Sequence, residues 1–103
     1  FCNIGDYSFI GMNTSINMDI PAFVKVAADP ARVIGLNSVG MTRNNITPES
    51  LSLIKKAYKL VYRKNLKIEE AISKSKELNK DKNCSFLDIF IKSLEISKRG
   101  ILR

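Results

Sequence analysis

The chain has 103 residues, a length that predicts one compact domain or part of a larger one. Its mean hydropathy is -0.07, and no apolar run approaches the roughly 18 residues that a membrane span needs. Its net charge of +7 favours an anionic partner, or else reflects a solvated lysine-rich surface. The sequence has no His, and Cys2 and Cys84 lie far apart, which excludes a Cys/His zinc site. Reduced thiols, typical of a cytoplasmic protein, are favoured over a disulfide.

Residues 1–19 carry a repeat of six residues, seen at Ile4-Gly5, Ile10-Gly11 and Ile16-Asn17. This spacing is typical of a hexapeptide β-helix, in which the aliphatic side chain points inward and the small residue lets the chain turn. A β-meander with accidental spacing is the alternative. Burying three Ile side chains contributes roughly 5–9 kcal/mol, whereas ordering about 18 residues costs on the order of 18–36 kcal/mol. Further coils are therefore expected to precede Phe1, and Phe1 is not expected to be the natural start.

An irregular segment follows, because Pro21 and Pro30 block helix propagation. A strand is predicted over 23–26 and a turn over 29–32. The domain boundaries predicted from these changes are the end of a β-helix and its exit strand over 1–35, a polar connector over 36–46, and a helical domain over 47–103.

Three helices are predicted in the last part of the chain from their apolar period. The first, over 48–63, has Thr47 as a cap and Pro48 at its first position. The second runs near 67–79, and the third begins near Ser85 and ends near Gly100, a residue suited to a C-terminal cap. The inward positions expected are Leu51, Leu53, Ile54, Ala57, Tyr58, Leu60 and Val61, then Ile68, Ala71, Ile72 and Leu78, then Phe86, Leu87, Phe90, Ile91 and Leu94.

Several motifs resemble those of the UDP-N-acetylglucosamine O-acyltransferases and follow one another along the chain in the same order as in that family. Residues 35–43 (GLNSVGMTR) resemble their connector G-x-N-x-x-G-x-x-R, 57–63 (AYKLVYR) their helix signature, and 97–103 (SKRGILR) their C-terminus. Phe1-Cys2 with Ile4-Gly5 resembles the segment after the family's His-Gln pair. The exit from the β-helix is also similar, although Ala28 stands where the family has Gly.

The resemblance implies a β-helix plus α fold: the last coil of a left-handed parallel β-helix followed by a C-terminal helical bundle, in a cytoplasmic homotrimer. It implies transfer of an (R)-3-hydroxyacyl group from acyl carrier protein to the 3-hydroxyl of UDP-N-acetylglucosamine in lipid A biosynthesis, with no cofactor or metal. Such a transfer needs a general base, a His in this family, so the 103 residues alone are predicted inactive. A non-catalytic trimerising or carrier-protein-binding module is the alternative. Nucleic-acid binding is disfavoured because the helices lack a basic-aromatic pattern.

The resemblance also implies four kinds of site residue. Arg43 is expected to bind the nucleotide diphosphate, unless it is a solvent-facing connector residue. Asn37 is expected near the nucleotide, unless it forms an Asx turn. Met12 matches the position that limits acyl-chain length, unless it packs between coils. Docking of the acidic carrier protein is expected on a basic face of the first helix, which is otherwise a solvated surface: Lys55, Lys56, Lys59, Arg63 and Lys64.

Overall fold

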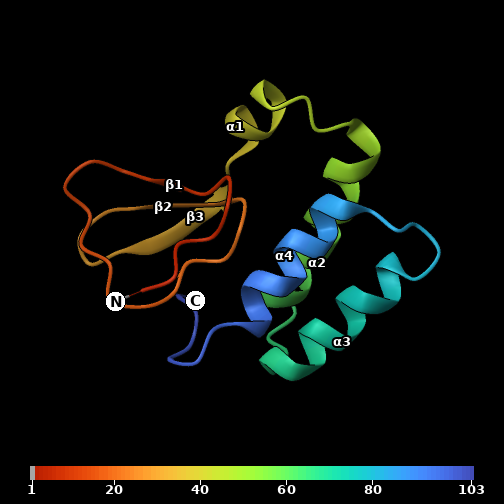
Figure 1. The fold of residues 1–103 in the computed structure, drawn as a ribbon. Helices are drawn as coiled ribbons and strands as arrows, with labels where there is room; N and C mark the ends of the chain where they lie inside the picture. Colours follow the sequence, from red (N-terminus) through yellow and green to blue (C-terminus); the bar gives the residue numbers. More distant parts are fainter. Residues whose placement is uncertain (1) are drawn as a thin grey trace.

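The computed structural model describes residues 2–103, and the motif position at Phe1 lies outside the described residues. Figure 1 shows short strands on one side of the molecule, helices α2–α4 on the other, and α1 where the strands end. The elements are β1 (Phe9–Ile10), β2 (Val24–Ala27), β3 (Arg32–Leu36), α1 (Ser38–Arg43), α2 (Pro48–Tyr62), α3 (Ile68–Asn79) and α4 (Ser85–Glu95).

Residues 2–27 form stacked coils. Parallel pairing joins Ile4 to Ile20, Phe9 to Lys25 and Ile10 to Val26, always at an offset of 16 residues. Backbone hydrogen bonds run between the same segments, from Gly5 N to Ile20 O at 2.7 Å and from Gly11 N to Val26 O at 2.8 Å. The offset is two residues short of three full hexapeptides, and the chain between the paired segments is irregular after Gly11.

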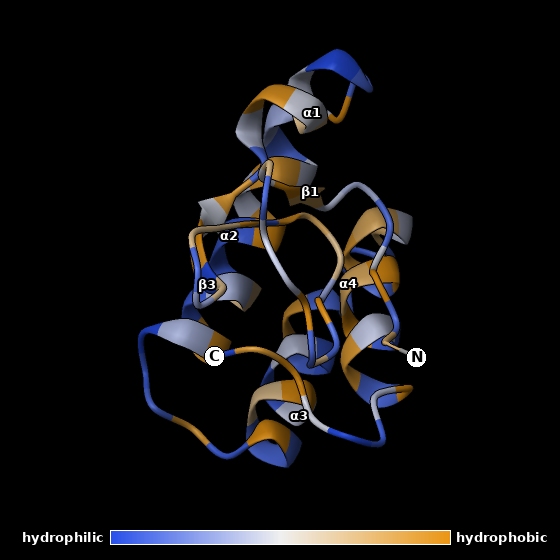
Figure 2. Ribbon diagram, turned by 90° about the vertical axis from the view of Figure 1, so that its left-hand side faces the viewer, coloured by the Kyte–Doolittle hydropathy of each residue, from blue (hydrophilic) through white to orange (hydrophobic). Residues whose placement is uncertain are grey.

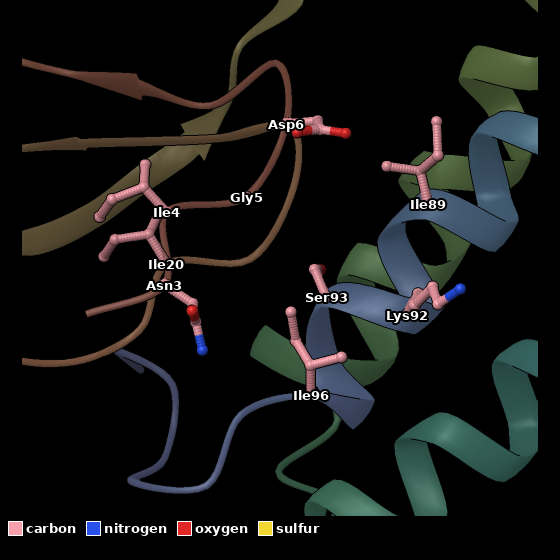
Figure 3. Close-up of a pocket in the computed structure, with 9 residues that line it drawn as sticks. All are labelled: Asn3, Ile4, Gly5, Asp6, Ile20, Ile89, Lys92, Ser93 and Ile96. Carbon is pink, nitrogen blue, oxygen red and sulfur yellow. The ribbon is translucent and has the colours of Figure 1, made fainter. Parts of the chain in front are cut away.

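The repeat residues keep only part of their predicted roles. Ile10 and Ile16 pack against the core. Ile4 is 46% exposed, but its side chain points to the same side of the coil as that of its bridge partner Ile20, which is 2% exposed (Figure 3). Gly5 is required by the neighbouring coil rather than by a turn. A Cβ there would lie 2.3 Å from the Ala22 nitrogen, closer than any side-chain carbon can approach.

The exit from the coils is a β-hairpin. The strand predicted over 23–26 is β2, shifted by one residue, and β3 pairs with it antiparallel after the predicted turn. Leu36, placed in the connector by the sequence, belongs to β3. The connector also contains α1, a six-residue helix that the sequence did not predict. Its stability comes from the Asn37 cap and from Met41, which is fully buried.

The helices begin and end close to their predicted bounds, with two corrections. The buried face of α3 is Ala71, Ser75 and Asn79, while Ile68, Ile72 and Leu78 are only half-buried. Asn79 tolerates burial because its amide donates to Cys84 O and Asp88 Oδ1 and accepts from Cys84 N. The other correction concerns α4, which ends at Glu95, so Gly100 is not its C-terminal cap.

The C-terminal tail returns to the coil instead. Gly100 adopts a φ of 101°, a left-handed conformation that favours glycine, and turns the chain so that Ile101 pairs in parallel with Asp19. Leu102 N donates to Asp19 O at 2.9 Å, and Asp19 N donates to Gly100 O at 3.1 Å. The tail thus adds a further rung to the coil and joins the two halves of the molecule.

A single core lies between the coil and the helices. Its largest fully buried side chains include Phe23 from the coil, Met41 from α1, Ile54 from α2, and Leu87 and Phe90 from α4. Figure 2 shows apolar and polar residues alternating around each of the longer helices, as one-sided burial requires. Cys2 and Cys84 are both free thiols. Within residues 2–103, no helix combines the length and apolarity needed to cross a bilayer.

Candidate functional site

Asn37 and Arg43, predicted to bind the same ligand, line one pocket of about 390 Å³. We call it the Arg43 pocket. Four elements build it, since the starts of β1 and β2 and the end of β3 lie beside α1. Its lining consists of Phe9, Lys25, Leu36, Asn37, Ser38, Val39, Gly40 and Arg43.

The amide of Asn37 already has protein partners on both of its polar atoms. Nδ2 donates to Tyr7 O at 3.0 Å, and Oδ1 accepts from Gly40 N at 3.2 Å. The backbone N–H of Asn37 also donates to Phe23 O at 2.8 Å. Asn37 therefore caps α1 and fixes it to two successive coils. This is a structural role, but it is an N-cap rather than the Asx turn given as the alternative.

The two cationic side chains of the Arg43 pocket, by contrast, have no ion-pair partner among residues 2–103. Arg43 is exposed in the last turn of α1, and Lys25 projects from β2 into the same space. Among residues 2–103, no carboxylate lines this pocket, and the only ion pair joins Lys76 to Glu95. The pocket is thus suited to an anionic ligand. Sequence reasoning missed Lys25; the only signal was its outward position between two buried valines.

The basic residues of α2 separate into two sets in space. Lys56, Lys59 and Lys64 line a groove of about 460 Å³ with Lys74 of α3, a residue that the sequence reasoning missed. We call it the lysine groove; Leu60 and Leu78 form its apolar part, and Glu77 also lines it. Lys55 instead faces a pocket beside the end of α1, and Arg63 lines none of the pockets described. The structure therefore brings together only part of the predicted docking face.

Met12 lies in the turn after β1 with 92% of its surface exposed. Its side chain makes no packing contact that would support the interpretation as a residue held between coils. The Met12 side chain is therefore accessible to a ligand or to another subunit.

A pocket of about 250 Å³ separates the coil from α4 (Figure 3). On the coil side its wall is the chain at Ile4, Gly5 and Ile20, with the two isoleucine side chains pointing away from α4. Ile89, Ser93 and Ile96 line the α4 side, and the Lys92 ammonium points away from the coil. Ser93 Oγ accepts from Ala22 N at 3.0 Å and donates to Phe90 O at 2.6 Å. The Ser93 hydroxyl is thus already used in joining α4 to the coil. We interpret this pocket as a gap in the packing between the coil and α4 rather than as a ligand site.

Two of the groups with shifted pKa values, Asp19 and Tyr62, have structural hydrogen-bonding roles. Burial alone would raise the pKa of Asp19, but the hydrogen bonds donated by Ser97 and Asn3, together with the Arg99 charge, lower it overall. Burial raises the pKa of Tyr62, whose hydroxyl donates to Leu102 O at 2.8 Å. Both groups lie where the C-terminal tail meets the rest of the chain.

Comparison with known proteins identifies the family. Residues 19–102 match the model of a family described as Udp N-acetylglucosamine O-acyltransferase, Domain 2. The chain belongs to this family. The acyl-[acyl-carrier-protein]--UDP-N-acetylglucosamine O-acyltransferases of Stutzerimonas stutzeri and Ectopseudomonas mendocina are 42% and 40% identical to it over its whole length. The chain spans 39% of the length of each of these relatives.

Solved structures of the family share the fold. LpxA from Acinetobacter baumannii is 36% identical and superimposes with a TM-score of 0.92, with 100% of this chain and 40% of that chain covered. The UDP-N-acetylglucosamine acyltransferase of Francisella novicida gives 35% identity and a TM-score of 0.90 over 100% of this chain and 37% of that chain. The predicted fold class, the last coil of a left-handed parallel β-helix followed by a helical bundle, is confirmed. The relatives are named as enzymes, which supports the acyltransferase interpretation over a non-catalytic module.

Proposed function

We propose that this chain is the C-terminal part of an acyltransferase that moves an (R)-3-hydroxyacyl group from acyl carrier protein to the 3-hydroxyl of UDP-N-acetylglucosamine, in lipid A biosynthesis. The observation that carries the proposal is the match of residues 19–102 to this acyltransferase family. The convergence of Asn37 and Arg43 on one anion-suited pocket agrees with it. The base that activates the sugar hydroxyl lies outside these 103 residues, which contain no His. The homotrimer and the cytoplasmic location stay predictions.

In this proposal Arg43 binds the diphosphate of the sugar nucleotide. A guanidinium keeps its charge and presents two parallel N–H donors to a phosphate. Asn37 contributes by fixing α1, and hence Arg43, against the coils, because its own amide is already bonded.

The test is Arg43→Ala in the full-length transferase, assayed with an acyl-carrier-protein thioester and UDP-N-acetylglucosamine. Loss of one charge-assisted contact costs roughly 1.5–3 kcal/mol, so kcat/KM for the sugar nucleotide is expected to fall about ten- to hundredfold. Arg32→Ala is the matched control, because Arg32 is exposed on β3 and lines none of the pockets described. Unchanged kcat/KM in Arg43→Ala would show that Arg43 does not bind the nucleotide.

We further propose that acyl carrier protein docks on the basic face of α2. The support is charge: Lys56, Lys59 and Lys64 stand beside Lys74 without ion-pair partners among residues 2–103, and carrier proteins are acidic. Reversing the charge of Lys56, Lys59 and Lys64 should raise the KM for the carrier thioester and blunt its salt dependence. Lys98→Glu, in the C-terminal tail, serves as the control. Equal salt sensitivity in the triple variant and the parent would place docking elsewhere.

Met12 is the proposed determinant of acyl-chain length. Its exposure leaves the side chain free to meet an acyl chain bound from outside the described residues. Each methylene of a donor gains about 0.8 kcal/mol when buried, and forcing it against a filled wall costs roughly 1–3 kcal/mol. Met12→Gly should therefore shift preference toward longer donors in a rate series of increasing chain length. An identical length profile for the parent and Met12→Gly would remove Met12 from the site.

A further inference from the structure

Phe9 and Lys25 face the Arg43 pocket as neighbours in adjacent coils. They are direct partners in the parallel pairing of β1 with β2, so their side chains leave the sheet on the same face. The Lys25 ammonium lies 5.8 Å from the centroid of the Phe9 ring. At this distance the ring face attracts the cation and restricts where the flexible lysine side chain points. Phe9 is 50% exposed, so both groups are open to a ligand.

The pocket needs more than one cation to match a nucleotide diphosphate, because each of its two phosphates carries a negative charge. Arg43 supplies one cation from α1. Asn44, the next residue, is uncharged, and its amide donates back to Gly40 O at 2.7 Å, which uses it to close α1. Lys25 is the other cation that lines the pocket, and it enters from the opposite element, β2.

We propose that Lys25 binds the diphosphate of the sugar nucleotide together with Arg43, and that Phe9 positions the Lys25 ammonium for this role. The inference rests on the proposed function and adds to it two residues of the coil. In this arrangement one cation lies on β2 and the other on α1, and a diphosphate bound between them would contact both the coil and the helical part.

The test measures binding of UDP-N-acetylglucosamine to the full-length transferase by calorimetry at two ionic strengths, with uridine as an uncharged probe. Lys25→Gln should weaken binding of the sugar nucleotide about three- to tenfold and reduce its salt dependence, because one charge-assisted contact is lost. Uridine should bind as it does to the parent. Lys25→Arg should restore most of the affinity, and Phe9→Leu should give a smaller loss. Lys80→Gln, an exposed lysine outside the pocket, is the matched control.

The outcomes separate this inference from the proposed function. Parent-like affinity in Lys25→Gln, alongside weakened binding in Arg43→Ala, would overturn the role of Lys25 and leave the proposed function standing. Parent-like affinity in both variants would contradict both proposals for this pocket. An equal loss for uridine and for the sugar nucleotide in Lys25→Gln would mean that Lys25 supports the fold rather than the phosphates, which also overturns the inference.

Discussion

The carboxylate of Asp19 is expected to be a main support of the junction between the coil and the C-terminal tail. Asp19 is 2% exposed, and its Oδ1 accepts from Asn3 N at 2.8 Å while Oδ2 accepts from the Ser97 hydroxyl at 2.6 Å. Its backbone adds two bonds to the tail, from Asp19 N to Gly100 O and from Leu102 N to Asp19 O. A substitution at this side chain therefore tests the whole junction without touching any residue of the Arg43 pocket.

Asp19→Asn removes the charge and keeps the shape. The amide retains one acceptor and places an NH₂ group against the other donor, so one charge-assisted bond is lost; such bonds contribute about 1.5–3 kcal/mol. Ser97 can rotate its hydroxyl to accept from the new NH₂, which puts the expected loss of unfolding free energy at about 2 kcal/mol. Asp19→Ala leaves both donors unpaired and should cost about 3–5 kcal/mol. Urea unfolding at pH 7, followed by circular dichroism, measures both losses.

The pH dependence gives a second, independent check of the same carboxylate. Because the folded pKa of Asp19 is lower than the model-compound value of 3.8, its contribution is fully present above that value and is lost as pH falls through the folded pKa. The difference in unfolding free energy between the parent and Asp19→Asn should thus be constant from about pH 5 to 8 and shrink below about pH 4. Equal stability of the parent and Asp19→Asn at neutral pH, with matching acid profiles, would refute the reasoning.

Three further outcomes are expected. Gly5→Ala should destabilise the coil by roughly 1–3 kcal/mol through its clash with Ala22, whereas Gly35→Ala, with open space at its Cβ, should change the urea midpoint little. Tyr62→Phe should cost about 0.5–1.5 kcal/mol in urea unfolding, because it leaves Leu102 O without its hydroxyl donor. The purified 103-residue chain should show no transfer between a carrier-protein thioester and UDP-N-acetylglucosamine, since it has no His to act as base; measurable turnover would disprove this.

The sequence correctly predicted the three helices whose positions depend on patterns within each segment. Helices α2 and α3 were placed within one residue, and the start of α4 at the residue itself, because their apolar period and capping residues lie within each segment. Helix α1 was missed, since six residues containing Gly40 show no period, and its stability depends on Asn37 reaching Tyr7 in an earlier coil. The prediction that Gly100 caps the last helix was wrong because it considered only neighbouring residues. Gly100 instead turns the chain so that Ile101 pairs with Asp19, which lies far away in the sequence.

The candidate site was predicted only where the resemblance supplied it. Arg43 and Asn37 were named from a motif, and the structure brings them to one pocket. Lys25 and Lys74 belong to no motif. Lys25 reaches its pocket only where the fold brings β2 near α1, and Lys74 only where α3 packs against α2. Composition gave the excess of positive charge, but the distribution of that charge depends on tertiary packing that no local period encodes.

The motifs that carry the family resemblance divide into two sets once their contacts are known. Asn37, Tyr62 and Arg103 bond to backbone carbonyls of other segments: Arg103 donates to Val61 O at 2.8 Å and to Leu66 O at 2.6 Å, closing the end of α2. The side chains of Arg43 and Lys59 make no hydrogen bond or ion pair within residues 2–103 and face pockets. A charged side chain without a protein partner adds little to stability at an exposed site, so its place in a motif points to a ligand. Substitutions in the first set should therefore lower stability and activity together, whereas those in the second should raise KM while the urea midpoint stays unchanged.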